Sequence, residues 1–410
     1  MVYGESLDET FEKFLSGKVF KNRDVMRPTF VPKELPHREE QITRVGVILA
    51  SALKDGTPSN VFVYGKTGTG KTAVTKYVLE RLSDKSLKLG VPAPIYAYVN
   101  CRMVDTNYRA LTKLADKVSS NIPSTGLSSY TVFSRFKKNL DSKKQLMIIV
   151  LDEVDILVKK SGTDILYGLT RINTQLKKAS VSIVGITNDL KFKDYLDSRV
   201  LSSLSEEEIV FPPYSALELQ DILSQRAEMG FYNGVLEFGV VNLCSALAAR
   251  EHGDARRALD LLRVAGELGE REGAKKITES YVRRALHEID RDTILEALTT
   301  LPIQQKLVLY SIYLLEKHGC SEIVTRNIFK VYLDLSQMLH MDSLTQRRVN
   351  DLINELDTLG IIGVKVVSKG RYGRTKRVAL SITDSQVKES LEADYRIKRC
   401  IGFIPNVPCD

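Results

Sequence analysis

The chain has 410 residues, enough for about two to four domains, and its 43% hydrophobic and 27% charged residues exclude a wholly disordered or fibrous protein. The longest strongly apolar run, residues 146–151, is far shorter than the roughly 20 residues that cross a bilayer, so no membrane partner is expected. Lysine and arginine outnumber aspartate and glutamate by 59 to 51, and the net charge of +8 suits a polyanionic partner. Residues 1–20 lack a secretory signal, so we expect a cytoplasmic protein.

The five cysteines are widely spaced and form no C-x-x-C pair. This pattern predicts neither a zinc site nor a disulfide framework. All five are therefore expected to be reduced.

Residues 1–35 are predicted to form an N-terminal arm, because Pro28, Pro32 and Pro36 would interrupt any helix. A helical pattern starts at Glu39, and the short apolar run 61–64 then predicts a strand that leads through a glycine-rich turn into a second helix. Further strands are predicted at 95–99, 146–151, 181–187 and 207–211, with helical patterns between them. This alternation is typical of an α/β domain with a parallel five-stranded sheet, here residues 36–213.

The remainder of the chain is predicted to add two further domains to this α/β part. After Pro212 and Pro213, residues 214–298 have a helical period throughout and form an α domain. A third domain, residues 299–410, begins with helices and ends in a basic hairpin.

The turn after the first strand carries a complete G-x-x-x-x-G-K-[ST] motif between a predicted strand and a predicted helix. Its glycines allow backbone N–H groups to surround phosphate oxygens at a helix N-terminus, where negative charge is favoured. We expect Lys71 to reach the β- and γ-phosphates of ATP and the Thr72 hydroxyl to ligate Mg²⁺. The predicted phosphate-binding residues are Gly65, Lys66, Thr67, Gly68, Thr69, Gly70, Lys71 and Thr72.

Two carboxylates follow the apolar strand 146–151 and should emerge at its carboxyl end, where ligands of open α/β sheets bind. Asp152 suits the Mg²⁺ shell, and Glu153 suits a general base for an attacking water. Asp155 is interpreted as a neighbouring surface acid. Asn188 follows the strand 181–187 and orients the same water, touches the γ-phosphate, or is a turn residue.

The C-terminal domain contains a predicted amphipathic helix from Ser343 to Gly360, followed by strands at 361–367 and 378–382. Helix followed by hairpin indicates a winged helix. The exposed face of the helix and the hairpin tip are rich in side chains that can contact duplex DNA. These residues are Gln346, Arg347, Arg348, Asn350, Lys369, Arg371, Tyr372, Arg374 and Lys376. A basic hairpin that only adds solubility, or a winged helix that contacts protein, remains an alternative.

In combination, these motifs resemble AAA+ ATPases, and more narrowly the archaeal origin-recognition and cell-division-control type replication initiators. The resemblance covers nearly the whole chain and implies an AAA+ base, a helical lid and a C-terminal winged helix. It is carried by the phosphate motif, by Asp152-Glu153 and by the segments 35–41, 100–102, 122–128, 186–189, 197–200 and 253–260.

The resemblance also implies roles for individual residues. Pro36, His37 and Arg38 should lie near the adenine, and Asn188 should be the first sensor. Arg199 should act as a finger toward the nucleotide of a neighbouring protomer, and Arg256 should approach the γ-phosphate in cis. Residues 122–136 resemble a helical insertion that contacts DNA.

As a member of this class, the protein would be a slow, Mg²⁺-dependent ATPase that uses ATP and ADP as a switch. Its expected partners are double-stranded origin DNA, other initiator protomers and the replicative helicase, and it would be associated with the nucleoid. Two alternatives remain: a nucleotide-gated winged-helix transcription regulator, and a clamp-loader-like remodelling ATPase.

Overall fold

A computed structural model describes residues 19–104, 106–118, 123, 126–204, 206–320, 322–368, 374–392 and 394–407. The chain divides into two compact units, Met1–Ala285 and Leu286–Asp410. Lys369, Arg371 and Tyr372 of the predicted hairpin tip lie outside the described residues.

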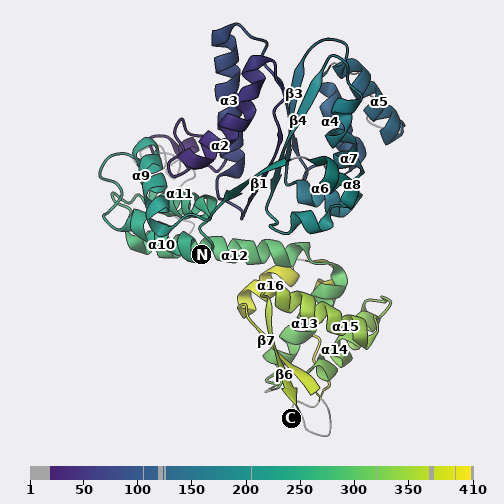
Figure 1. The fold of residues 1–410 in the computed structure, drawn as a ribbon. Coiled ribbons are helices and arrows are strands. Elements are labelled where there is room, and N and C mark those ends of the chain that lie inside the picture. Colours follow the sequence, from purple (N-terminus) through teal and green to yellow (C-terminus); the bar gives the residue numbers. More distant parts are fainter. Residues whose placement is uncertain are drawn as a thin grey trace. The chain divides into compact units, whose positions relative to one another are not determined.

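The first unit is built on a five-stranded sheet in which every strand pair is parallel and the order is β2-β3-β4-β1-β5 (Figure 1). The strands are β1 (Asn60–Gly65), β2 (Ile95–Asn100), β3 (Leu146–Asp152), β4 (Ser180–Thr187) and β5 (Glu206–Phe211). This confirms the predicted parallel sheet. All five carboxyl ends meet at one edge of the sheet, because the strands run in the same direction.

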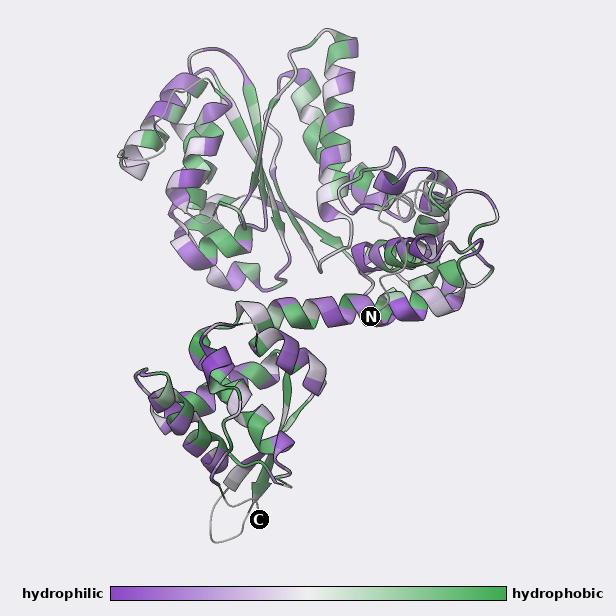
Figure 2. Ribbon diagram, turned by 180° about the vertical axis from the view of Figure 1, so that it is seen from behind, coloured by the Kyte–Doolittle hydropathy of each residue, from purple (hydrophilic) through white to green (hydrophobic). Residues whose placement is uncertain are grey.

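Both faces of the sheet are covered by helices, so the central strands are apolar on both sides (Figures 1 and 2). On β3, Met147 and Ile149 pack into one core, whereas Ile148 and Val150 pack into the other. The helices of the base are α2 (Glu39–Leu49), α3 (Lys71–Leu89), α4 (Asn107–Asp116), α5 (Ser129–Leu140), α6 (Val154–Ser161), α7 (Asp164–Thr170) and α8 (Ser198–Leu204).

A helical lid follows the sheet within the same unit. It contains α9 (Ala216–Gly230), α10 (Val240–Arg250) and α11 (Ala255–Arg271), after which α12 (Glu279–Thr300) continues into the second unit. Residues 19–30 of the arm pack on this lid, with the N–H groups of Lys21 and Asn22 both donating to the carbonyl of Gly230 at 2.8 and 3.1 Å. The short 3-10 helices of the chain are η1 (Arg23–Met26), η2 (Ala50–Lys54), η3 (Ile172–Thr174), η4 (Phe192–Tyr195) and η6 (Ile397–Cys400).

The second unit is a winged helix, as predicted. It consists of α13 (Ile303–Lys317), α14 (Thr325–Met338), α15 (Gln346–Thr358), β6 (Ile362–Ser368), β7 (Arg374–Leu380) and α16 (Asp384–Leu391). The prediction that the second strand begins at Val378 is wrong. Strand β7 begins at Arg374, which pairs with Ser368 of antiparallel β6. A two-stranded sheet leaves one face exposed, so basic residues can occupy strand positions that a search for apolar residues assigns to a turn.

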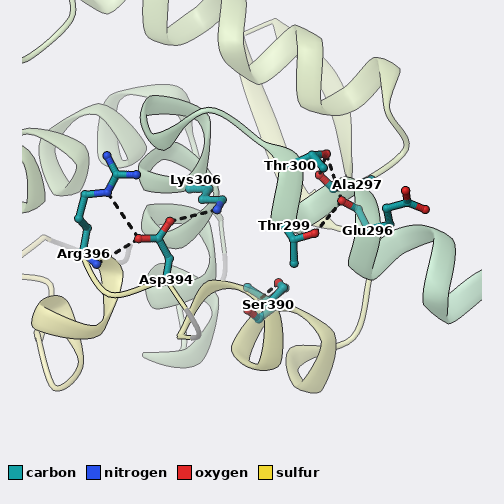
Figure 3. A network of polar contacts seen from close by, with 9 residues as sticks. Glu296, Ala297, Thr299, Thr300, Lys306, Ser390, Asp394 and Arg396 are labelled. Carbon is teal, nitrogen blue, oxygen red and sulfur yellow. Dashed lines mark hydrogen bonds and ion pairs between the residues drawn. The ribbon is translucent and has the colours of Figure 1, made fainter. Parts of the chain in front are cut away.

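The C-terminal segment of this unit is fixed to α13 by a polar network (Figure 3). Asp394 accepts hydrogen bonds from Lys306 Nζ and from the N–H of Arg396, both at 3.0 Å. Burial opposes ionisation of Asp394, but these donors outweigh it and the pKa of the carboxyl is lowered. The network therefore holds a partly buried ion pair between α13 and the segment after α16.

Two further predictions concern the chain as a whole. Cys101, Cys244 and Cys400 are free and buried, but Cys320 is disulfide-bonded, so the expectation that all five cysteines are reduced is wrong. None of the helices in the described part of the chain is long and apolar enough to cross a membrane.

Candidate nucleotide-binding site

A cavity of about 380 Å³ lies at the carboxyl edge of the sheet, within the first unit. Three parts of the chain contribute to its walls: the base, the lid and the arm. The lining residues are Pro28, Thr29, Phe30, Val31, Pro32, Leu35, Pro36, Thr67, Gly68, Thr69, Gly70, Lys71, Thr72, Ala73, Lys76, Tyr98, Asn100, Asp152, Glu153, Asn188, Tyr214, Ile222, Gln225, Arg226, Ala255, Arg256 and Leu259. Most of the predicted nucleotide-site residues are thus assembled around one hollow.

The phosphate loop, residues 65–72, joins β1 to α3, and its tight path requires glycine. Gly68 and Gly70 have φ values of +72° and +89°, in the left-handed region that favours glycine. A Cβ atom at Gly68 would lie 1.7 Å from Asp254 Oδ1 of the lid, and one at Gly70 would lie 2.8 Å from the hydroxyl of Tyr214. The loop therefore brings its main chain close to the lid in front of the N-terminus of α3, where anions are favoured.

Lys71 is the first residue of α3, and it is only 5% exposed. Its Nζ donates to the carbonyls of Gly65 and Lys66 at 2.8 and 2.6 Å. Burial lowers the pKa of Lys71 to about 8, although the Asp152 carboxylate opposes the shift. Lys71 is a cation that is costly to desolvate, and it has no ion pair with any other described residue. Phosphate oxygens would be strong partners in this setting.

Asp152 receives two hydrogen bonds on one carboxylate oxygen. Thr72 Oγ1 donates to Asp152 Oδ2 at 2.9 Å, and the Tyr98 hydroxyl donates to the same atom at 2.6 Å. Burial and this contact with Asp152 both raise the pKa of Tyr98, so the hydroxyl remains a donor. The hydroxyl of Thr72 and the carboxylate of Asp152 are hard oxygen ligands of the kind that Mg²⁺ prefers, so the residues fit the expected ion.

Glu153 is held in an uncommon backbone conformation at the end of β3. Its φ is +57° and its ψ is +44°, and its Oε2 is buried without a hydrogen-bond partner in the described structure. A buried carboxylate oxygen without a donor is unfavourable, so this position is suited to a water or a ligand hydroxyl.

The interpretation of Asp155 as a surface acid is wrong, because Asp155 is 8% exposed and accepts from Thr187 Oγ1 at 2.9 Å. This bond joins α6 to the end of β4. Asn188, directly after β4, lines the cavity. The hydrogen bond thus fixes the strand end that carries Asn188.

The two predicted arginines are placed differently. Arg256, in the first turn of α11, lines the cavity. Arg199, on α8, is not among the cavity residues; its side chain is 68% exposed and pairs with Asp197 at 3.0 Å. Arg199 is thus available to another molecule rather than to the cavity of its own chain.

The side chains of the three consecutive residues expected near adenine have different surroundings. Pro36 lines the cavity, but His37 and Arg38 do not. His37 contacts Asp221 Oδ2 at 2.9 Å. Arg38 is 2% exposed and donates to the carbonyls of Thr69 and Pro212 at 2.9 and 2.7 Å. Arg38 also stacks on the ring of Tyr214 at 3.7 Å, so its guanidinium supports the phosphate loop from behind.

Sequence reasoning missed Tyr98, Arg226 and the arm residues 28–32 as parts of this site. Tyr98 lies on an edge strand two residues before Asn100, and strand alternation predicts that it shares a face with the strand end. Arg226 and the arm meet only in the folded chain, since almost 200 residues separate Arg226 from Phe30, and Arg226 Nη2 donates to the Phe30 carbonyl at 3.0 Å.

The second unit contains the side chains predicted to contact DNA. Gln346, Arg347 and Arg348 are exposed on the first turn of α15, and Asn350 is half-buried. Arg348 pairs with Glu355 at 3.1 Å. Lys376 on β7 donates to Asn354 Oδ1 of α15 at 2.6 Å, which ties the hairpin to the helix. Arg374 begins β7.

Three family models match this chain in succession. Residues 34–184 match the AAA ATPase domain, residues 220–287 the Cdc6 AAA+ ATPase-type lid domain, and residues 296–390 the CDC6 C-terminal winged helix domain. Together with the fold and the cavity, these matches define an AAA+ ATPase with a Cdc6-type lid and a winged helix.

The chain is 55% identical over 397 residues to the ORC1-type DNA replication protein of Pyrococcus furiosus, covering 96% of this chain and 94% of that protein. It is 52% identical to the ORC1-type DNA replication protein 1 of Methanosarcina mazei, covering 99% of each. It therefore belongs to the ORC1-type DNA replication proteins. Its structure matches the Aeropyrum pernix ORC1 protein solved in complex with DNA, with a TM-score of 0.84 and 48% identity, covering 94% of this chain and 100% of that chain.

Proposed function

We propose that this initiator binds duplex DNA at replication origins through its winged helix, that ATP and ADP switch this binding, and that it helps to recruit or load the replicative helicase. The observation that carries the proposal is the joint presence, in one chain, of the assembled cavity and a Cdc6-type winged helix. The DNA complex of the Aeropyrum pernix relative supports the DNA-binding part.

The cavity is suited to a nucleoside triphosphate in a defined orientation. Phosphate oxygens would replace the carbonyls of Gly65 and Lys66 as partners of Lys71 Nζ, because charged acceptors bind an ammonium group more strongly than neutral ones do. Thr72 and Asp152 would hold Mg²⁺, which neutralises charge on the phosphates when bound. The nucleoside would extend toward Pro36 and the arm residues.

Hydrolysis would depend on groups around the terminal phosphate. Glu153 would orient and deprotonate water through its unpartnered Oε2, with Asn188 positioning the same water. Arg256 would stabilise negative charge from the lid, and Arg199 would do so only in a neighbouring protomer. Slow turnover by an isolated chain follows, since the exposed Arg199 cannot complete its own site.

DNA would be read by α15 and the hairpin. Exposed Arg347 and Arg348 at the start of α15 can contact phosphates or base edges, and β7 carries further basic residues. In the sequence, Lys369 and Arg371 add two more basic residues between β6 and β7. The segment 122–136 would add a second contact with DNA. Residues 129–136 of it lie on α5, whose last turn carries Lys137 and Lys138 just beyond that segment.

Genomic footprinting in ATP and in ADP tests this proposal. Protected sites should lie at replication origins, and protection should differ between the two nucleotides. Protection beside genes without any link to origins would favour the transcription regulator. Vigorous ATP turnover with weak binding to duplex DNA would favour the remodelling ATPase.

A further inference from the structure

Arg226 on α9 is a buried cation at the side of the cavity. Arg226 is 6% exposed. Burial lowers the pKa of its guanidinium to about 10, so the side chain remains charged at neutral pH. No ion pair found among the described residues includes Arg226. A buried charge without a counter-charge is unfavourable unless its hydrogen bonds are well satisfied.

The partners of Arg226 are main-chain carbonyls of the arm. Nη1 donates to the carbonyl of Val25 and Nη2 to that of Phe30, each at 3.0 Å, and the guanidinium carbon lies 4.7 Å from the centre of the Phe30 ring. The two carbonyls stand five residues apart, so one planar guanidinium closes a loop of the arm between them. The conformation of residues 25–30 thus depends on a lid side chain.

This loop leads directly into a wall of the cavity. Phe30, Val31 and Pro32 line the same cavity as Arg226. Residues before the loop are held by the lid, since Arg23 pairs with Glu270 and the ring of Phe20 lies 4.6 Å from that of Phe231. Residues after it reach Arg38, which is fixed to the phosphate loop. The arm therefore bridges lid and base along the cavity.

We propose that Arg226 is a positioning residue that holds arm residues 28–32 as the nucleoside-side wall of the site. This inference rests on the proposed binding of ATP. The hydrogen bonds that Arg226 makes among the described residues go to the arm and not to the phosphate loop. Arg226 should therefore contribute equally to ATP and ADP affinity and should not affect binding of phosphates that carry no nucleoside. Discrimination between ATP and ADP would remain with Lys71 and Arg256.

Calorimetric titration of the full chain with ATP, ADP and inorganic tripolyphosphate tests the proposal. Arg226→Lys keeps the charge but loses the planar fork, and Arg226→Gln keeps a planar donor without the charge. Each variant should weaken ATP and ADP by the same factor, about tenfold, with tripolyphosphate unchanged. Arg263→Lys is the matched control, because Arg263 is a lid arginine paired with Asp260 and Glu267 outside the cavity; it should bind all three as the wild type does.

A direct readout of the arm accompanies these titrations. Trypsin should cleave after Lys33 faster in the Arg226 variants than in the wild type or in Arg263→Lys, because the arm is released. If Arg226→Gln does not fold, hydrogen exchange of the wild type decides: ATP and ADP should slow exchange of residues 28–35 to the same extent.

The outcomes separate the two proposals. A wild type that binds neither ATP nor ADP contradicts the proposed function itself. If the wild type binds but the Arg226 variants match it, or if tripolyphosphate affinity or the ATP-to-ADP ratio changes with them, the positioning role of Arg226 is wrong. Unchanged exchange of residues 28–35 on nucleotide binding contradicts it as well.

Discussion

At the scale of single residues, the site uses burial to prepare charged groups for a charged ligand. Lys71 and Arg226 both lie in the cavity wall with neutral carbonyls as their close partners, and burial lowers the pKa of both. The Oε2 of Glu153 is buried and has no hydrogen-bond partner in the part of the chain that the structure describes. Such an arrangement costs stability in the free protein and leaves these groups ready to bind a polar ligand.

The pKa of Lys71, about 8, predicts a pH dependence of ATP binding. Bound phosphates favour the charged amine and raise its pKa, so ATP binding takes up a proton above pH 8. Affinity should be full below pH 8 and fall by up to about tenfold per pH unit above it. Calorimetry at about pH 8.5 in buffers of different ionisation enthalpy measures the proton uptake. Lys71→Arg stays charged and should lack this dependence; identical pH profiles for the two proteins would contradict the assignment.

The contribution of Lys71 to the stability of the folded protein changes with pH in the opposite direction to ATP affinity. The folded-state pKa lies below the ordinary value of 10.5, so the unfolded chain binds more protons between these two values. The contribution of Lys71 to stability therefore rises with pH through this window. This opposite sign distinguishes a loss of ATP affinity above pH 8 from alkaline unfolding.

Tyr98 should act through Asp152. Tyr98→Phe removes the donor 2.6 Å from Asp152 Oδ2 and frees the carboxylate to rotate. We expect the Mg²⁺ concentration needed for ATP binding to rise about tenfold, with ATP binding in EDTA unchanged. The measurement is a Mg²⁺ titration of ATP binding followed by fluorescence. Tyr96→Phe, on the same strand but outside the cavity lining, is the control; an equal effect of both variants would contradict a specific role for Tyr98.

At the scale of elements, the N-terminus of α11 connects lid and phosphate loop. Asp254 caps the helix by accepting from the N–H groups of Arg256 and Arg257 at 2.7 and 3.3 Å. The next residue, Ala255, donates its N–H to the carbonyl of Gly68 at 3.2 Å. The position of Arg256 over the cavity therefore depends on this cap.

Asp254→Ala should destabilise the first turn of α11 by about 1 kcal/mol, whereas Asp254→Ser should retain most of the cap. Hydrogen exchange of the α11 amides should be about fivefold faster in Asp254→Ala than in the wild type, because a loss of about 1 kcal/mol corresponds to a fivefold change in the opening equilibrium. Exchange in Asp254→Ser should stay close to that of the wild type. ATP affinity should fall in parallel, because Arg256 is less well placed. Equal exchange rates in both variants would mean that the cap does not hold the lid.

The elements themselves could largely be predicted from the sequence. The apolar strands β1 to β4, the phosphate loop and α15 each carry a local periodicity or motif that is strong within a dozen residues. Strand β7 was predicted too short because its first residues are basic. The contacts of Arg38, Arg226 and Asp155 could not be predicted, since each depends on a partner distant in sequence and none follows a local pattern.

At the scale of the whole molecule, the chain combines a nucleotide cavity in one unit with a basic winged helix in the other. If α15 binds duplex DNA, Arg347→Ala should weaken binding and reduce the slope of log affinity against log salt by about one. Fluorescence anisotropy across a salt series measures both. Arg291→Ala, which removes a partner of Glu389, is the control; an unchanged slope for Arg347→Ala would remove this residue from the interface.

We propose above all that the phosphate loop binds a nucleoside triphosphate in the cavity between base, lid and arm. The most direct measurement is equilibrium titration of the full chain with ATP and Mg²⁺, beside the Lys71→Ala variant. The account predicts one site per chain and a loss of affinity of at least about tenfold on removal of the Lys71 ammonium group. Equal binding by both proteins, or no binding by the wild type, would contradict it.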